Sequence, residues 1–357
     1  MRPVVLGIFA LLSMLAPTVG LTQSLITAPS NNGSGGVFMN LQPVAGKLTM
    51  VGFDVPFASA APGVAVSIEV WTRVGTYAGF TDSNVGWTLT QTVAGLTQGA
   101  DQPVSFGLTT PISLLPTEIT AVYLHSITSG AGIRYTGTGG APPQTTFANT
   151  DLGLFSDAAR TGNIAFAGGL NSPRTFSGAI RYNKTLETAP ANNGSGGVFL
   201  NLQPVAQDLV FKGFDVPLGP TAGTVVSVQV WTRVGSYAGF TDNGAGWTLT
   251  QTINGVAQGT MIPAPFVLTT PIALPEAQIT GVYLQAILPA LTGSGIRYSG
   301  TADAPPQTLW SNSDLVLFAD TARTGFVSFG GTQNSPRTFS GTVQYAFDSV
   351  FADGFED

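Results

Sequence analysis

The sequence predicts an all-β protein made of two tandem jelly-roll or Greek-key β-sandwich domains. The first observation is an internal duplication, because residues 31–182 recur as residues 192–345 with only short insertions. The second is that apolar and polar residues alternate in short segments separated by Gly, Asn and Pro, as they do in antiparallel strands joined by turns. A repeat of about 160 residues is the size of a whole domain rather than of a solenoid or propeller unit. We therefore expect domains over residues 24–183 and 184–347.

The N-terminus is typical of a secretory signal peptide. Arg2 precedes an apolar run over residues 4–16 that is too short to span a bilayer, and small residues follow at Thr18 and Gly20. We expect cleavage after Gly20, so that residues 1–20 are removed and the mature protein is secreted or held at the cell surface. Because no second long apolar run occurs, we expect no membrane span in the mature chain.

Composition excludes several classes of function. The chain has no cysteine, so disulfides, thiolate metal ligands and a catalytic thiol are excluded. Only 9% of the residues are charged, and the net charge is −6. Four acids, Asp348, Asp353, Glu356 and Asp357, lie in the last ten residues, which leaves the repeats nearly neutral. A neutral surface does not attract nucleic acid or an anionic membrane, and we expect neither as a partner.

Strand patterns occur at matching places in both copies. Val66, Ile68 and Val70 alternate with polar or amphipathic neighbours, which predicts a strand with one buried face. The same alternation occurs again in residues 175–182, which we expect to form the last strand of the first repeat. The Gly-rich residues 31–36 lack the Lys-Ser or Lys-Thr of a phosphate-binding loop, so we expect turns there. Further strands are expected at residues 48–55, 87–93, 119–127 and 164–167.

A series of motifs recurs in the same order in each copy. In the first copy they read NNGSGG, GFDVP, VWTRVGTYAGF, GWTLTQT, GIRYTGT, NTDLGLF and SPRTFSG. This order resembles a β-sandwich repeat of secreted bacterial proteins, some of which carry PEP-CTERM-type sorting tails. The resemblance implies export and a β-sandwich, but no activity and no binding residues. The chain lacks the apolar helix and basic cluster of such a tail. It ends instead in an acidic and aromatic segment, residues 348–357, which we expect to act in export or surface sorting.

Four Asp and four Arg residues occupy matching positions in the two copies, whereas no Glu is matched. The Asp residues are Asp54/Asp215, Asp82/Asp242, Asp151/Asp314 and Asp157/Asp320. The Arg residues are Arg73/Arg233, Arg134/Arg297, Arg160/Arg323 and Arg174/Arg337. Equal numbers of carboxylates and guanidinium groups predict ion pairs and Arg-to-carbonyl hydrogen bonds that hold loops in place. The alternative is that two Asp carboxylates cooperate in the hydrolysis of a polysaccharide.

No cofactor or metal is predicted from the remaining polar residues. The only histidine, His125, is matched by Gln285, so a catalytic triad or a zinc site would depend on one copy alone. Asp82 and Asp242 lie in oxygen-rich turns of the kind that bind calcium, but the same sequences form ordinary Asx turns.

One face of each repeat is the place where we expect a ligand. If Val66, Ile68 and Val70 point into the core, then Trp71 and Arg73 point to the opposite face, and a Gly-rich loop brings further aromatic rings beside them. Aromatic rings stack on sugars or peptide side chains. The alternative is that Arg73 stacks on Trp71 and that the loop aromatics close the end of the sandwich. The expected ligand-binding residues are Trp71, Arg73, Tyr77, Phe80 and Trp87, with Trp231, Arg233, Tyr237, Phe240 and Trp247 in the second copy.

These observations predict a non-catalytic pair of modules outside the cell. The expected partner is a glycan, a surface polymer or an extracellular protein, and two copies would add avidity. A structural role in a coat or matrix belongs to the same class. The competing function is a polysaccharide hydrolase that uses Asp carboxylates, which requires two matched Asp side chains in one cleft.

Overall fold

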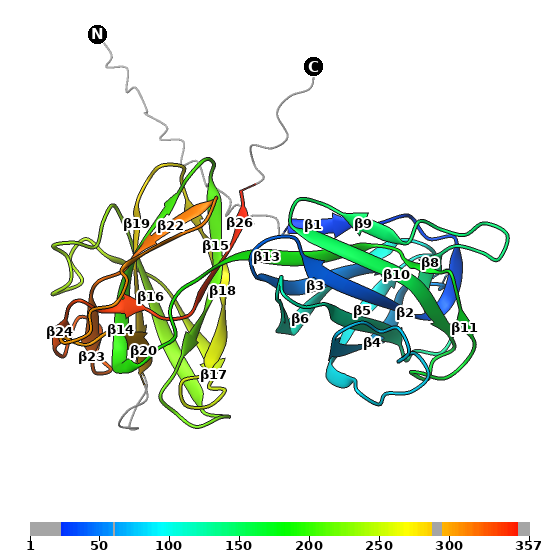
Figure 1. Cartoon of the computed structure of the whole chain (residues 1–357), viewed down its shortest axis with the longest axis horizontal. Helices are drawn as coiled ribbons and strands as arrows, with labels where there is room; N and C mark the ends of the chain where they lie inside the picture. Colours follow the sequence, from blue (N-terminus) through cyan, green and yellow to red (C-terminus); the bar gives the residue numbers. More distant parts are fainter. Residues whose placement is uncertain (1–22, 60, 288–294, 349–357) are drawn as a thin grey trace, which may run out of the picture.

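The computed structural model describes residues 23–59, 61–287 and 295–348. The regular secondary structure of these residues consists of β-strands. The strands pair in antiparallel sheets that pack as two β-sandwich lobes, one for each repeat (Figure 1). The predicted all-β sandwich class is therefore confirmed. These segments contain no helix that is long and apolar enough to cross a membrane. The predicted signal peptide and all of the predicted tail after Asp348 lie outside the described residues.

The first repeat forms one sheet of its own and part of a second. Its strands are β1 (Gln23–Ile26), β2 (Asn32–Pro43), β3 (Leu48–Pro56), β4 (Pro62–Val74), β5 (Thr88–Gln98), β6 (Pro103–Leu114), β7 (Thr120–Ser126), β8 (Ile133–Thr136), β9 (Thr146–Ala148), β10 (Leu152–Thr161), β11 (Leu170–Asn171), β12 (Thr175–Phe176) and β13 (Ala179–Glu187). Its own sheet has the order β11-β10-β2-β7-β4-β5, with β8, β9 and β12 paired beside this path.

The second repeat has the same plan. Its strands are β14 (Asn193–Pro204), β15 (Leu209–Pro217), β16 (Val225–Val234), β17 (Thr248–Val256), β18 (Pro263–Leu274), β19 (Thr280–Ala286), β20 (Ile296–Ser299), β21 (Leu309–Ser311), β22 (Leu315–Phe318), β23 (Ala322–Thr324), β24 (Gln333–Asn334), β25 (Thr338–Phe339) and β26 (Thr342–Phe347). Its own sheet has the order β17-β16-β19-β14-β20-β25, with β21 to β24 beside this path.

A third sheet is shared by the two repeats, in the order β18-β15-β26-β13-β3-β6, with β1 also paired to β13. β13 ends the first repeat and begins the second. Its Tyr182 pairs with Gln23 of β1, and two residues later its Lys184 pairs with Tyr345 of β26. Gln23 is equivalent to Lys184 in the duplication, and Tyr182 is equivalent to Tyr345. The two lobes are therefore related by an approximate two-fold axis that passes between β13 and the strands β1 and β26 beside it.

Each lobe has its own hydrophobic core between its two sheets. In the first lobe, Ile68 and Val70 of β4 belong to a buried cluster that includes Phe53 and Phe106 of the shared sheet. Those two rings stack at 5.4 Å, and the equivalent Phe214 and Phe266 stack at 5.2 Å in the second lobe. Burial of each such side chain contributes roughly 1.5–3 kcal/mol to folding. The predicted inward face of β4 is confirmed, because the residues between these positions are only partly buried.

Most predicted strands are present, but three local predictions are wrong. Residues 164–167 form a turn in which Phe166 has a φ of 62°. Residues 175–182 form two strands in different sheets rather than one, because the chain crosses between the sheets at Gly178. Gly178 has a φ of 134°, and a Cβ there would lie 1.9 Å from the backbone oxygen of Asp54. Residues 32–36 belong to β2 rather than forming turns. A Cβ on Gly36 would lie 2.5 Å from the Nδ1 atom of His125, so glycine allows the strands to approach.

Candidate functional site

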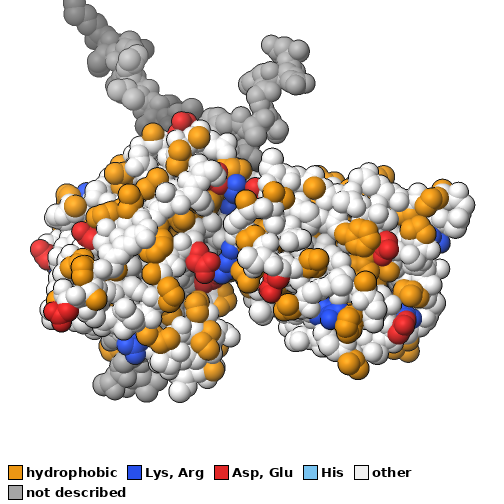
Figure 2. Space-filling model, in the orientation of Figure 1, with side chains coloured by type: hydrophobic (Ala, Val, Ile, Leu, Met, Phe, Trp, Pro, Cys, Tyr) orange, Lys and Arg blue, Asp and Glu red, His pale blue; other side chains and the backbone are white. Residues whose placement is uncertain are grey.

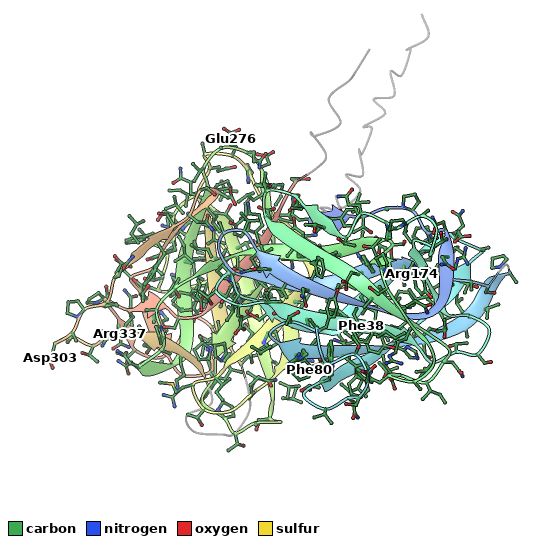
Figure 3. All side chains as sticks on the ribbon, turned by 45° about the vertical axis from the view of Figure 1, so that its right-hand side comes forward. Phe38, Phe80, Arg174, Glu276, Asp303 and Arg337 are labelled. Atoms are coloured by element: carbon green, nitrogen blue, oxygen red, sulfur yellow. The ribbon has the colours of Figure 1, made fainter. Side chains whose placement is uncertain are left out.

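The outer face of the β11-β10-β2-β7-β4-β5 sheet carries a second buried cluster, which we call the outer cluster of repeat 1. It contains Phe38, Tyr77, Trp87, Tyr123 and Phe166, with Trp71 packed against it. Phe38 stacks on Tyr123 with ring centroids 3.9 Å apart, and Tyr123 lies 4.9 Å from Phe166. The loop over residues 75–87 and the turn over residues 162–168 supply the covering side chains. Phe38 lies in the lobe of repeat 1, and so does Phe80 of the covering loop (Figure 3).

Hydrogen bonds hold the covering loop on this cluster. The Tyr77 hydroxyl donates to Asp157 at 2.6 Å, and the Trp87 indole donates to the Phe80 carbonyl at 2.8 Å. Burial, together with the bond to Asp157, raises the pKa of the Tyr77 phenol well above its usual value. Tyr77 and Trp87 are only 2% and 8% exposed. Of the expected binding residues, these two therefore support the surface from below.

Arg73 stacks on Phe80 rather than on Trp71. Its guanidinium carbon lies 3.3 Å from the Phe80 ring centroid and 5.9 Å from that of Trp87. It also donates to the Thr76 carbonyl. The second repeat has the same arrangement, with Arg233 3.2 Å from the Phe240 ring. Because the cation already covers an aromatic face, Arg73 and Phe80 brace the loop.

Matched Asp and Arg residues form one predicted ion pair in both repeats. Arg160 pairs with Asp82, and Arg323 pairs with Asp242. Arg160 also donates to the Thr81 and Gly168 carbonyls, so that one guanidinium joins the two covering segments. The prediction that arginines hold loops is confirmed at this position. The other three matched acids of the first repeat do not pair with a matched arginine. Asp54 pairs with Arg181, Asp151 pairs with Lys184, and Asp157 accepts a hydrogen bond from Tyr77.

A groove of about 520 Å³ opens beside the outer cluster, between the two covering segments. We call it the repeat-1 groove. Its lining includes Glu69, Trp71, Asp82, Asn84, Asn163 and Phe166. Trp71 is partly exposed, packs edge-on to Phe166 at 5.2 Å, and donates from its indole nitrogen to Glu69 at 2.9 Å. Among the expected binding residues, Trp71 is the one that lines this groove.

The sequence prediction missed the polar lining of the groove. Asn163 lies 94 positions from Glu69 in the chain, so spacing gave no reason to bring them together. One signal was present, because the two copies differ here: Glu69 is matched by Gln229, and Asn163 is matched by Phe326. In the second repeat, Gln229 accepts hydrogen bonds from Trp231 at 3.2 Å and from Ser328.

His125 is fully buried in β7 and takes part in packing. Its Nδ1 atom lies 2.7 Å from the Tyr123 hydroxyl. The equivalent Gln285 accepts from Tyr283 and donates to the Gly325 carbonyl at 2.9 Å. A neutral imidazole with its proton on Nε2 offers the same acceptor and donor, which explains how both residues fit one position.

Burial also determines the charge of His125. It lowers the pKa of the imidazole to about 4, against a smaller raising effect from the backbone of Asn163. Among the described residues, no group forms a hydrogen bond of ordinary geometry with the Nε2 atom. A buried imidazole that is neutral at pH 7 is not placed for proton transfer to a ligand.

Two equivalent acids meet at the junction of the lobes. The Lys184 ammonium lies 3.3 Å from Asp151 and 2.7 Å from Asp314, and the junction groove around them measures about 360 Å³. Tyr182 and Tyr345 donate to these carboxylates at 3.2 and 3.0 Å. Burial alone would raise the pKa of Asp314, but hydrogen bonds, above all from Lys184, hold it below its usual value. Basic and acidic side chains gather along this junction (Figure 2).

No family model, curated protein or solved structure matches this chain. The resemblance to exported bacterial β-sandwich repeats therefore stays a prediction. Across the described ranges, which omit residues 1–22, 60, 288–294 and 349–357, no group of three or more His, Asp or Glu side chains could hold a metal ion.

Proposed function

We propose that this chain is an exported, non-catalytic pair of modules that binds a glycan at the repeat-1 groove. The observation that carries the proposal is the combination in one groove of a partly exposed indole with acidic and amide side chains. Sugar rings offer apolar C–H faces that pack on aromatic rings, and hydroxyls that bond to carboxylate and amide groups. A concave surface with an apolar wall and a few polar groups fits that chemistry.

Asp82, Asp157 and His125 are already engaged in contacts within the protein, which supports a binding role rather than catalysis. Asp82 is paired with Arg160, and Asp157 accepts from Tyr77. His125 is buried and neutral. A general acid or base must reach the substrate and have its titrating group free to exchange a proton. His125 is buried, and Asp82 and Asp157 are already bonded to Arg160 and Tyr77.

The test is binding of the full mature chain to an array of glycans, followed by titration of the best ligand. Trp71→Ala is expected to weaken binding by about tenfold or more, because it removes the apolar wall. Trp231→Ala is the matched control in the second repeat and is expected to have the smaller effect. Circular dichroism and melting curves of both variants check folding. A folded Trp71→Ala variant that binds as tightly as the wild type would place the site elsewhere.

A second candidate function is polysaccharide hydrolysis, because two matched acids, Asp151 and Asp314, lie in one groove. Lys184 counts against it, since its ammonium pairs with both carboxylates and the pKa of Asp314 is lowered rather than raised. A screen with polysaccharide, ester and peptide substrates decides between the candidates. Turnover that is lost in Asp151→Asn and Asp314→Asn would establish the hydrolase and reject the binding proposal.

A further inference from the structure

The acids of the first repeat differ in whether a cation neutralises them. Asp54, Asp101 and Asp151 have Arg or Lys partners at 3.1, 2.9 and 3.3 Å. Glu69 in the repeat-1 groove has no Lys or Arg partner among the described residues, and its one hydrogen bond there comes from the Trp71 indole. That bond orients the carboxylate beside the ring and leaves its negative charge uncompensated.

A second carboxylate of the groove is paired with a buried arginine but is itself exposed to solvent. Asp82 lies in the same lining, and its side chain is 83% exposed although one oxygen contacts Arg160. The Arg160 side chain is 7% exposed, so the groove presents the acid rather than the base. A concave surface with one sign of charge raises the local concentration of the opposite ion. An aromatic ring beside a carboxylate is also the pairing that favours an ammonium group, which is attracted to both.

The second repeat provides an internal comparison. Gln229 is neutral, and its Oε1 atom already accepts from Trp231 and from Ser328. Asn163 is replaced by Phe326, which removes an amide from the equivalent wall. The indole is retained while the free charge is lost. The second repeat therefore lacks the unneutralised carboxylate on which cation binding would depend.

We infer that the repeat-1 groove selects an amino sugar whose amine is free and protonated, and that Glu69 is the residue that determines this specificity. This inference rests on the proposed function. In the complex, the ligand ammonium would donate to the Glu69 carboxylate beside Trp71. The amide N–H of an N-acetylated sugar can still donate to the carboxylate, but it carries no positive charge and forms no ion pair.

The test compares two ligands of equal length, a β-1,4-linked glucosamine hexamer and its fully N-acetylated counterpart, titrated calorimetrically at pH 6 into the full mature chain. The wild type is expected to bind the free amine about tenfold more tightly, the range of a charge-assisted hydrogen bond. Glu69→Gln copies the second repeat and is expected to remove this preference while retaining the binding of the acetylated hexamer. Gln229→Glu is the gain-of-function control and is expected to raise the number of amine sites from one to two.

The outcomes separate this inference from the proposed function. Equal binding of the two hexamers by the wild type, or an amine preference that survives in Glu69→Gln, would overturn the inference and leave glycan binding intact. If neither hexamer binds, the inference is wrong, and the glycan array with Trp71→Ala decides the proposed function independently.

Discussion

The two repeats share the aromatic stack on the outer face of their own sheets. In the outer cluster of repeat 1, Phe38 stacks on Tyr123 at 3.9 Å, and in the second repeat Phe199 stacks on Tyr283 at 4.0 Å. Each sits on the outer face of its own sheet under a loop held by a Tyr-to-Asp hydrogen bond of 2.6 Å. Close packing resists change in volume, so substitutions at these positions are costly in either copy.

The copies differ at one groove position and at one buried position. Glu69 and Gln229 occupy the same strand position, as do His125 and Gln285. The first difference changes charge at a groove, and the second exchanges two buried side chains that both bond to a neighbouring Tyr hydroxyl. The comparison teaches that a difference in the interior must keep the packing, whereas a difference at a groove can change the charge and so the function.

The largest expected effect is on the shared interior. Phe38→Ala and Phe199→Ala should each lower the free energy of unfolding by about 3–5 kcal/mol, because both remove a fully buried ring from an aromatic stack. Urea denaturation followed by tryptophan fluorescence measures this loss. The losses are expected to agree within about 1 kcal/mol. A loss below about 1 kcal/mol in one copy would show that its outer cluster is loosely packed.

The second-largest expected loss of stability is at the junction of the two lobes. Lys184→Gln introduces the residue found at the equivalent Gln23 and is expected to cost about 3 kcal/mol, since it leaves Asp151 and Asp314 facing each other without a cation. Lys184→Arg is the matched control that keeps the charge. Equilibrium unfolding at pH 7 measures both. If Lys184→Gln is as stable as Lys184→Arg, the two carboxylates do not depend on the ammonium.

The exchange of His125 and Gln285 predicts a difference in acid sensitivity. The pKa of His125 is lowered from 6.5 to about 4, so the unfolded state binds the proton first as pH falls. Stability from this residue is therefore complete above about pH 6.5 and lost between about pH 6.5 and 4. At pH 4.5 the loss is about 2–3 kcal/mol.

The variants exchange the two residues. His125→Gln is expected to abolish this part of the pH dependence, and Gln285→His to introduce it in the second repeat. Melting temperatures measured from pH 7 to pH 4 test both. Unchanged pH profiles would mean that the ring is accessible to protons in the folded state.

The smallest expected effect concerns Asp215. Burial raises its pKa, Lys47 and Gln344 oppose this, and Glu187 adds to it. The equivalent Asp54 has Arg181 at 3.1 Å, where the second repeat has Gln344.

Gln344→Arg would restore this pair and is expected to add about 0.5–1 kcal/mol at pH 7. The raised pKa means that ionised Asp215 costs stability as pH rises, so the gain should vanish at low pH, once the carboxyl is protonated. Arg181→Gln in the first repeat is the reverse variant. Urea titrations at the two pH values measure the change, and a gain that persists at low pH would contradict an ion pair.

Alternation in the sequence predicted the strands whose two faces have different surroundings. Val66, Ile68 and Val70 lie in one core, so a period of two was visible in β4. It failed at Phe166, which is apolar and buried but belongs to a turn with a positive φ. It also failed at Gly178, because an alternating pattern does not reveal that a chain leaves one sheet for another.

The candidate site could be predicted only in part. Trp71 was identified because it shares a strand with the core residues opposite it. Asn163 and Phe166 reach the same groove from a turn that is distant in sequence, and periodicity carries no information about such contacts. The mismatch between Glu69 and Gln229 was the one signal in the sequence. That Glu69 lines a groove beside Trp71 follows only from the structure.

The shared strand has one more consequence, for the number of repeats that can join in this way. β26 and β1 lie end to end on one edge of β13, and Ala346 holds in the second repeat the place that Asn183 holds in the first. A bond from Ala346 to Gln23 would reproduce the natural bond from Asn183 to Lys184. Joining these two residues and opening the chain elsewhere would keep the strand order of the shared sheet. A third repeat added through the same joint would have to insert its first strand where β1 already lies, so a third copy could not join this sheet in the same way.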